Sequence, residues 1–203
     1  MRLRKRKNLA ARMEQAGDYL ISPVLQPQLP LSAASRCLLE LGCGMGRFAC
    51  ETAAVNPEAF VIGVERVADA IIIGMERAKQ ENLSNVRFLL GDAEELPRFF
   101  APGSIDELYI HFCDPWPHRK QASRRLVARN FLQIYRPLLN GTLYFRTDNA
   151  PLFAFAQKEL LTEGWTITQS NADSPPAAGM TDYEIKFRAK NIPICSLSAT
   201  PFS

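Results

Sequence analysis

Short apolar runs alternate with stretches of helical spacing in the first half of the chain. The apolar runs cover residues Cys37–Leu41, Phe60–Val64, Val86–Leu90 and Leu108–Phe112. Between the first three runs, apolar residues recur at the spacing of an amphipathic helix over Phe48–Val55 and Val67–Gln80. Strands that alternate with helices are typical of a parallel sheet with helices on its faces, so the pattern predicts an α/β fold.

The second half of the chain extends this pattern. A helix is expected over Ala122–Tyr135, because Pro137 forbids its continuation. The remaining expected elements are a strand over Gly141–Arg146, a helix over Leu152–Leu161, and strands over Trp165–Gln169 and Glu184–Arg188. With these runs the predicted sheet is mostly parallel, has seven strands and is flanked by helices.

Length and composition predict one domain. The chain has 203 residues, of which 47% are hydrophobic, so it can bury a core of ordinary size. We expect a single domain over residues 9–203, preceded by a basic arm over residues 1–8. No apolar run of about 18 residues is present, which excludes a membrane span, and no apolar stretch follows the basic start. A cytoplasmic location is therefore expected.

The cysteines predict neither a disulfide framework nor a metal site. They are scattered, odd in number and partly inside apolar runs: Cys37, Cys43, Cys50, Cys113 and Cys195. Such spacing favours buried, reduced thiols. No metal is expected.

The distribution of charge is more informative than its sum, which is +3 at pH 7. Five of the first seven residues are cationic, and a second basic cluster follows Trp116: Arg119, Lys120, Arg124, Arg125 and Arg129. Two basic clusters in a small domain favour a nucleic-acid partner. A solvated, disordered tail explains the first cluster equally well. No obligate protein partner is indicated.

An acidic turn built on two prolines, Asp114–Pro117, leads into the second basic cluster. Pro115 and Pro117 each fix their own φ and move the preceding residue out of the helical region, so Asp114 and Trp116 are expected in extended geometry. A carboxylate and an indole are then presented rigidly beside several cations, which suits a flat, electron-rich substrate carried on a polyanion. A solvated loop before an exposed helix would account for the cations but not for Asp-Pro-Trp-Pro.

A glycine-rich turn follows the first predicted strand, as Gly42-Cys43-Gly44-Met45-Gly46. At such a turn a ligand can lie against bare backbone and the amino terminus of the next helix. Dinucleotide binding is the first alternative, but its G-x-G-x-x-G fingerprint needs glycine at position 47, where Arg47 stands. Glu40, just before the turn, would repel a pyrophosphate and suits a cationic ligand such as S-adenosylmethionine.

Carboxylates follow several predicted strands. Glu65 stands where such sheets place an acid that binds two ribose hydroxyls, and Asp92, before Ala93, could accept from the exocyclic amine of an adenine. An Asp after a strand is also a common turn former or helix cap. Ligands of open α/β sheets bind outside the carboxyl ends of the strands. Four acids are therefore expected to converge there: Glu40, Glu65, Asp92 and Asp114.

These features together resemble the class I S-adenosylmethionine-dependent methyltransferases, and more narrowly the bacterial tRNA (guanine-N(7)-)-methyltransferases. The narrow match rests on Asp114-Pro115-Trp116-Pro117, with support from Arg146-Thr147-Asp148, Thr181-Asp182-Tyr183-Glu184 and Lys186-Phe187. It covers the chain from Met1 to about Leu197. The resemblance implies a Rossmann-like class I methyltransferase fold. It also implies methyl transfer from S-adenosylmethionine to N7 of a tRNA guanine, at the variable-loop guanine of conventional position 46.

The resemblance implies roles for the residues that match the family's motifs. The cofactor-binding positions are Glu40, Gly42, Gly44, Gly46, Glu65, Asp92, Ala93 and Asp114, and Asp114 is also the implied catalytic residue. The substrate-binding positions are His118, Asp148, Thr181, Asp182, Tyr183 and Glu184. The RNA-contacting positions are Arg119, Lys120, Gln121, Ala122, Ser123, Arg124 and Arg125.

Two positions depart from the family's pattern. The family usually has Lys at the position of His118, so a phosphate or substrate contact there is expected to be weaker or pH-dependent. Gln121 replaces a residue that is commonly histidine.

The expected oligomeric state is a monomer, with a homodimer as the alternative.

Two other functions stay open at this point. Methyltransferases of exocyclic amines in DNA or RNA use Asn or Asp followed by Pro-Pro and an aromatic residue, whereas here Trp116 occupies the second proline position. A non-catalytic RNA-binding scaffold of the same fold is the other alternative. The complete set of cofactor-site acids argues against it.

Overall fold

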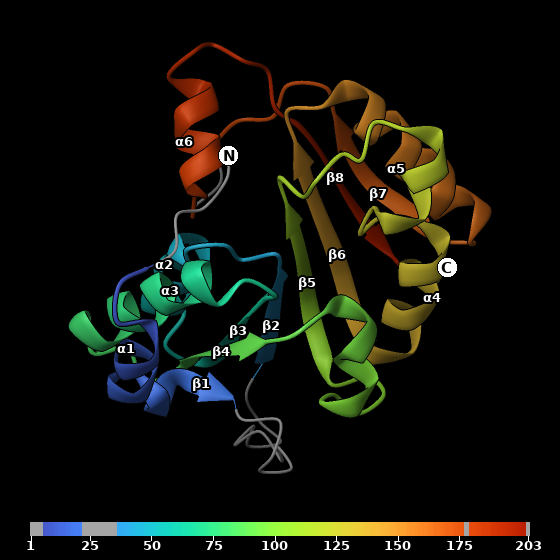
Figure 1. The fold of residues 1–203 in the computed structure, drawn as a ribbon. Coiled ribbons are helices and arrows are strands. Elements are labelled where there is room, and N and C mark those ends of the chain that lie inside the picture. Colours follow the sequence, from blue (N-terminus) through green and yellow to red (C-terminus); the bar gives the residue numbers. More distant parts are fainter. Residues whose placement is uncertain (1–5, 22–35, 177–178, 202–203) are drawn as a thin grey trace.

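The computed structural model describes residues 6–21, 36–176 and 179–201, and shows a sheet with helices on both faces (Figure 1). Most of the predicted basic arm, residues 1–5, lies outside the described residues. The strands in chain order are β1 (Leu20–Ile21), β2 (Arg36–Leu41), β3 (Ala59–Glu65), β4 (Val86–Leu90), β5 (Ile105–His111), β6 (Leu139–Thr147), β7 (Thr166–Asn171) and β8 (Cys195–Thr200).

The order of the strands places a reversal at the middle of the sheet. It runs β1-β4-β3-β2-β5-β6-β8-β7, so the chain builds outward from β2 in both directions. All pairs are parallel except those that β8 makes with β6 and β7. The described residues thus form eight strands where seven were predicted, because the two-residue β1 adds an edge. A strand-order reversal is where open α/β sheets bind ligands.

The helices lie in two layers. They are α1 (Leu9–Gln15), α2 (Arg47–Val55), α3 (Ala68–Gln80), α4 (Arg129–Leu138), α5 (Ala150–Thr162) and α6 (Asp182–Arg188), with 3-10 helices η1 (Gly17–Tyr19), η2 (Ala93–Arg98) and η3 (Arg119–Arg124). Helices α1, α2 and α3 lie on one face of the sheet, and α4 and α5 on the other (Figure 1). Helix α6 stands outside both layers, above α2 in this view.

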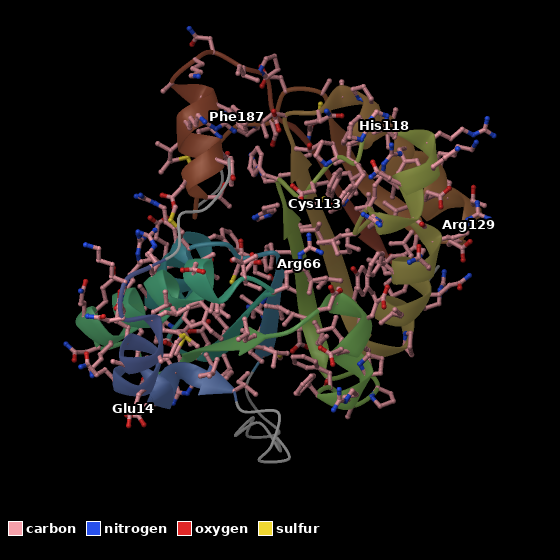
Figure 2. All side chains as sticks on the ribbon, in the orientation of Figure 1. Glu14, Arg66, Cys113, His118, Arg129 and Phe187 are labelled. Carbon is pink, nitrogen blue, oxygen red and sulfur yellow. The ribbon has the colours of Figure 1, made fainter. Side chains whose placement is uncertain are left out.

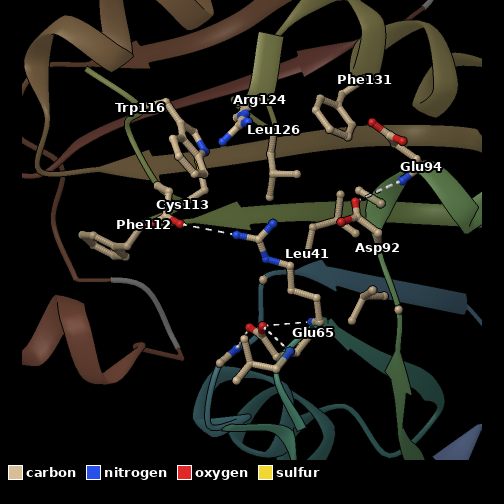
Figure 3. A pocket seen from close by; sticks show the side chains of 18 of the residues that line it. Leu41, Glu65, Asp92, Glu94, Phe112, Cys113, Trp116, Arg124, Leu126 and Phe131 are labelled. Atoms are coloured by element: carbon tan, nitrogen blue, oxygen red, sulfur yellow. Dashed lines mark hydrogen bonds and ion pairs between the residues drawn. The ribbon is translucent and has the colours of Figure 1, made fainter. Parts of the chain in front are cut away.

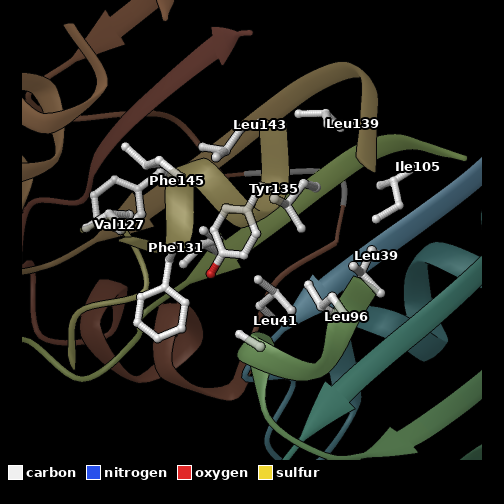
Figure 4. Packing of buried hydrophobic residues seen from close by; sticks show 14 of the residues in the cluster. Leu39, Leu41, Leu96, Ile105, Val127, Phe131, Tyr135, Leu139, Leu143 and Phe145 are labelled. Atoms are coloured by element: carbon white, nitrogen blue, oxygen red, sulfur yellow. The ribbon is translucent and has the colours of Figure 1, made fainter. Parts of the chain in front are cut away.

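Alternate residues of β2 pack into the two layers. Leu38 belongs to the apolar cluster that contains α2 and α3, whereas Leu39 and Leu41 belong to the cluster of α4 and α5. Figure 4 shows the second cluster, in which Leu41 and Leu96 lie beside the buried Tyr135 ring. Strands covered on both faces read as continuous apolar runs, which is why the sequence pattern located most of them.

The segment Glu184–Arg188 is helical, so its prediction as a strand was wrong. It lies within α6, whose first turn is capped by Thr181: the hydroxyl accepts from the Glu184 N–H at 3.0 Å. Acids in the first turn and cations in the last favour the helix further. The sheet contains β8 instead, in which apolar residues alternate with serine at the period of a strand.

The helix predicted over Ala122–Tyr135 is interrupted. Helix η3 ends at Arg124, after which Arg125 and Ala128 adopt extended geometry before α4 begins. Val127 between them is fully buried. Pro137 stands inside the last turn of α4, which ends one residue later, so the predicted stop was wrong. Proline is tolerated there because it removes a single backbone hydrogen bond.

All five cysteines are free thiols, and four of them are buried as predicted. Cys113 is partly exposed. Within the described ranges, no helix has both the length and the apolarity that crossing a bilayer requires.

Candidate functional site

A pocket of about 610 Å³ opens at the carboxyl ends of the central strands (Figure 3). Its walls come from the turn after β2, the segments after β3 and β4, and the turn after β5. Residues of η3 and α4, the segment between these helices, and Tyr183 of α6 complete them. Ligand pockets commonly measure roughly 300–1,000 Å³, so this one accommodates a nucleoside-sized ligand.

The glycine turn after β2 exposes backbone to the pocket. Gly42, Gly44 and Gly46 have positive φ of 72°, 55° and 69°, which residues with a side chain rarely adopt. A Cβ on Gly44 would meet no atom within 4 Å, so Gly44 faces open space. A Cβ on Gly46 would lie 2.7 Å from Gly74 Cα and from the Phe88 ring. Gly46 therefore allows α2 to pack against α3 and does not line the pocket.

The Glu65 carboxylate ties the glycine turn to the end of β3. One oxygen accepts from the Gly44 N–H at 3.0 Å. The other accepts from the N–H groups of Arg66 and Val67 at 2.9 and 3.0 Å (Figure 3). Because the carboxylate lines the pocket with these bonds already made, its position does not depend on a ligand.

Asp92 lines the pocket and caps η2. Its Oδ1 accepts from the Glu94 N–H at 3.5 Å, and the Glu95 carboxylate accepts from the Asp92 N–H at 3.4 Å. This is the capping box that an acid after a strand often forms. The buried Ala93 follows in the pocket wall. The interpretation of Asp92 as a helix cap is therefore confirmed, and the same residue is available to a ligand.

Asp114 lies on the pocket wall with its side chain 73% exposed. The Arg66 guanidinium lies 3.9 Å from its Oδ2 (Figure 3). Exposed ion pairs of this length contribute little to stability, so Arg66 leaves the carboxylate accessible to a ligand.

Trp116 does not adopt the extended geometry predicted for it, because its φ is +40°. Arg125 accounts for the difference: its guanidinium donates to the carbonyl oxygens of Pro115 and Trp116 at 2.9 and 3.0 Å. The Arg124 guanidinium also lies 5.0 Å from the centroid of the Trp116 ring. Contacts from outside the turn thus override the local preference imposed by Pro117.

Glu40 lies behind the pocket wall, whereas the other three acids expected to converge line it. Its side chain is buried, and this burial raises its pKa to about 8, although the Ala49 N–H donates to it and acts in the opposite direction. Its Oε2 has no hydrogen-bond partner among the described residues. The role of Glu40 as a cofactor contact stays a prediction. No group of three or more His, Cys, Asp or Glu side chains in the described ranges is arranged to hold a metal ion.

His111 ends β5 as a buried residue. The Phe48 and Tyr109 rings lie 4.5 and 5.5 Å from its ring, centroid to centroid. Burial and, to a smaller extent, the charge of Arg146 lower its pKa to about 3. Its Nδ1 has no hydrogen-bond partner among the described residues. The neutral ring packs as an apolar group outside the pocket wall.

Helix α6 is held against β6 by a buried ion network. The Glu184 carboxylate is 1% exposed and accepts from Arg146 at 3.1 Å and from Arg188 at 2.9 Å. Asp182 accepts from Arg47 of α2 at 3.3 Å. The network positions Tyr183, which lines the pocket.

The other predicted substrate-binding residues do not line this pocket. Asp148 is exposed after β6, and His118 is exposed before η3. Figure 2 shows His118 at the same end of the molecule as Phe187 of α6. Thr181 caps α6, and Glu184 anchors it. Their contacts with a substrate stay predictions.

The predicted RNA-contacting residues form η3, with Arg125 directly after it. Arg119, Lys120, Ser123 and Arg124 are exposed, and Gln121 and Ala122 are half-buried. Ser123 and Arg124 also line the pocket, so the basic segment continues into it. Two cations of the cluster have partners in the fold: Arg125 binds the acidic turn, and Arg129 binds Glu159 of α5 at 3.2 Å.

The pocket contains residues that the sequence patterns did not indicate. They are Arg66, Phe112, Leu126 and Asn130, among others. Arg66 directly follows Glu65, and Phe112 precedes the acidic turn, so adjacency to a motif was an available signal for both. Leu126 and Asn130 belong to no such motif, and only the tertiary structure brings them to the pocket.

Comparison with known proteins identifies relatives over most of the chain. A family model described as "Putative methyltransferase" matches residues 34–197. The tRNA (guanine-N(7)-)-methyltransferase of Macrococcus caseolyticus (strain JCSC5402) is 39% identical over 167 residues, which cover 79% of this chain and 80% of that protein. The protein of the same name from Staphylococcus carnosus (strain TM300) is 34% identical over 167 residues, with 79% of each chain covered.

Solved structures with a similar fold are also methyltransferases. The 16S rRNA methyltransferase KamB has a TM-score of 0.64 at 14% identity, with 98% of this chain and 95% of that chain covered. TrmN from Thermus thermophilus has a TM-score of 0.60 at 20% identity, with 95% of this chain and 47% of that chain covered. At these identities the likeness shows the fold alone, which is the Rossmann-like class I methyltransferase fold. With the family model and the curated relatives, it follows that the chain belongs to the tRNA (guanine-N(7)-)-methyltransferase family.

Proposed function

We propose that this protein transfers a methyl group from S-adenosylmethionine to N7 of a guanine in tRNA, at the variable-loop guanine and in the cytoplasm. The observation that carries the proposal is a pocket that joins the glycine turn and three acids to an exposed basic segment. Relatives that match about four-fifths of the chain are named for this reaction.

The residues around the pocket fit S-adenosylmethionine. Gly44 presents bare backbone to space that a Cβ would occupy. Glu65, held by three N–H groups, presents a carboxylate suited to ribose hydroxyls, and Asp92 suits the adenine amine. The Oε2 of Glu40, which has no hydrogen-bond partner in the part of the chain that the structure describes, lies behind the turn, where a cationic ligand favours ionisation of the carboxyl group. When bound, S-adenosylmethionine supplies an electrophilic methyl group.

Guanine N7 carries an in-plane lone pair and no proton, so its attack needs no general base. This agrees with a site whose accessible acid is Asp114 and whose nearby histidine, His111, is neutral and packed away. Asp114 orients the base through hydrogen bonds and stabilises the positive charge that develops on the purine. Positioning of the base supplies most of the remaining rate.

The basic segment and α6 bind the substrate around this centre. Exposed cations of η3 contact tRNA phosphates. Tyr183, whose ring lies 6.4 Å from that of Phe112, offers an aromatic face to a base. Asp148 and Asp182 accept from guanine N1–H and its exocyclic amine, while Thr181 and Glu184 hold α6 in place.

Product analysis tests the proposal. The protein is incubated with methyl-labelled S-adenosylmethionine and unmodified tRNA, and the tRNA is digested to nucleosides. We expect the label in 7-methylguanosine. Label on an exocyclic amine would assign the protein to the other methyltransferase class. Absence of label, together with absence of cofactor binding in titration calorimetry, would favour a binding scaffold.

A further inference from the structure

We infer that Arg125 is a positioning residue of the site, which holds the acidic turn in shape rather than contacting RNA. The acidic turn is defined as residues Asp114–Pro117. The kinetic consequences of this inference rest on the proposed function, whereas its structural consequence does not.

The acidic turn has little support of its own. Pro115 and Pro117 have no N–H, so half of the turn cannot donate a backbone hydrogen bond. Within the described ranges, the turn makes no backbone–backbone hydrogen bond and forms no regular secondary structure. Trp116 has a φ of +40°, a conformation that costs energy in a bulky residue and persists only where surrounding contacts impose it.

Arg125 supplies the missing contacts. Its Nε donates to the Pro115 carbonyl at 2.9 Å, and its Nη2 donates to the Trp116 carbonyl at 3.0 Å. A planar guanidinium can reach two consecutive carbonyls because its donors form a rigid fork. Hydrogen bonds from a charged donor are also stronger than neutral ones. One side chain therefore restrains the Pro115–Trp116 and Trp116–Pro117 peptide units, which lie just after the candidate catalytic carboxylate.

Arg125 is itself anchored to the core. Its guanidinium lies 4.3 Å from the centroid of the Phe155 ring on α5, and Phe155 packs against the apolar cluster of α4 and α5. The Arg125 N–H donates to the Ala122 carbonyl at 3.2 Å, and the Arg125 carbonyl accepts from the Ala128 N–H at 2.9 Å. The restraint therefore extends from α5, through Arg125, to the acidic turn.

Arg124 is the matched comparison, because it carries the same charge one residue earlier. Arg124 is exposed and lines the pocket, whereas Arg125 is half-buried and does not. A guanidinium that stacks on a ring and binds two carbonyls has given up much of its capacity for a phosphate. Arg124 also lies over a ring, that of Trp116 at 5.0 Å, but its guanidinium makes no hydrogen bond among the described residues, so it keeps that capacity.

Steady-state kinetics of Arg125→Ala and Arg124→Ala separate the two roles. A displacement of about 1 Å at a reacting group can cost about 100-fold in rate. We therefore expect Arg125→Ala to lower kcat about tenfold to a hundredfold, with little change in KM for tRNA or in its salt dependence. Arg124→Ala is expected to raise KM, and to reduce the slope of log affinity against log salt by roughly 0.7–0.9, the loss of one phosphate contact.

Arg125→Lys adds a charge-conserving variant. A lysine cannot bridge two carbonyls with a fixed fork, so we expect it to lower kcat nearly as much as alanine does. Circular dichroism verifies that each variant is folded. Weaker tRNA binding by Arg125→Ala that Arg125→Lys restores would overturn the inference and make Arg125 a phosphate contact.

Fluorescence of Trp116 provides a readout that needs no substrate. The chain has two tryptophans, so Trp165→Phe leaves Trp116 as the emitter. The replacement breaks no hydrogen bond among the described residues, because Nε1 of Trp165 is buried without a partner there. In this background, Arg125→Lys is expected to increase acrylamide quenching of Trp116 and to lower its anisotropy. Unchanged values would overturn the inference even if the unmutated protein methylates tRNA. Increased quenching in a protein that methylates no tRNA would count against the proposed function alone.

Discussion

Asp114 is the single residue on which the proposed chemistry depends most. Its carboxylate is exposed in the pocket and has one weak ionic partner, Arg66, at 3.9 Å. Because guanine N7 has no proton to lose, the carboxylate acts through its charge and its hydrogen bonds. The contribution of Asp114 to catalysis should therefore be lost in a substitution that removes the charge and keeps the shape of the side chain.

Asp114→Asn makes that change. Loss of one preorganised electrostatic group typically costs about 10²–10³ in kcat, and we expect a reduction of this order. Steady-state methylation of tRNA measures it, with thermal unfolding as the control for folding. Turnover near that of the unmutated protein, in a variant of normal stability, would show that Asp114 is not catalytic.

Glu40 makes stability depend on pH. Burial raises its pKa from 4.5 to about 8, so between these values the folded state keeps a proton that the unfolded state has released. Its contribution to stability is therefore fully present below pH 4.5 and is lost as the pH rises through about 8. Glu40→Gln removes this titration, so its Tm should decline less across the window than that of the unmutated protein. Parallel declines in thermal unfolding would show that Glu40 is already ionised in the fold.

The elements around the pocket are positioned by close packing on one side and by buried charge on the other. Helices α2 and α3 meet at Gly46 and Gly74, beside the Phe88 ring. Helix α6 meets β6 through the Glu184 carboxylate and two arginines. The first contact has no space for a methyl group, and the second depends on a carboxylate that is 1% exposed.

Gly74→Ala tests the packing of α2 against α3. Alanine is the better helix former by about 1 kcal/mol. Its Cβ, however, would lie 2.8 Å from the Phe88 ring and 3.0 Å from Gly46 Cα. Overpacking costs ~1–3 kcal/mol, so we expect a net loss of stability in chemical denaturation. Gly17→Ala is the control, because its Cβ would meet nothing within 4 Å. A gain in stability for Gly74→Ala would mean that the two helices can separate freely.

Glu184→Gln tests the attachment of α6. The substitution leaves the Arg146 guanidinium, whose side chain is 11% exposed, without a charged partner. Breaking a buried ion pair on one side is strongly destabilising, and we expect the effect to concentrate in α6. Hydrogen–deuterium exchange should therefore accelerate over Asp182–Arg188 while α2 and α3 keep their protection. Unchanged exchange over α6 would show that other contacts hold this helix.

Across the whole molecule, the basic segment matters through its placement and not through net charge, which is only +3. Three exposed cations lie on η3, next to the pocket: Arg119, Lys120 and Arg124. Each neutralised phosphate contributes roughly 0.7–0.9 to the slope of log affinity against log salt, so three contacts predict a slope of about −2 to −3. Binding of labelled tRNA across a salt series measures this slope. An affinity independent of salt would contradict the proposed RNA-binding face.

Much of the fold and part of the site could be predicted from the sequence, because their signals are local. Apolar runs located the central strands, and the backbone freedom of Gly44 and the acid of Glu65 indicated the pocket. The cap at Thr181 was equally local, and the strand predicted over Glu184–Arg188 failed because that cap was not recognised.

Folding alone separates residues that look alike in the sequence. Glu40 and Glu65 both lie within the last two residues of a strand, yet Glu40 is buried with a raised pKa and Glu65 faces the pocket. Arg124 and Arg125 are neighbours of equal charge, yet Arg125 turns inward to the acidic turn and Phe155. The residues that bury these side chains or form hydrogen bonds with them belong to segments far along the chain. No property of the residue or of its immediate neighbours carries that information.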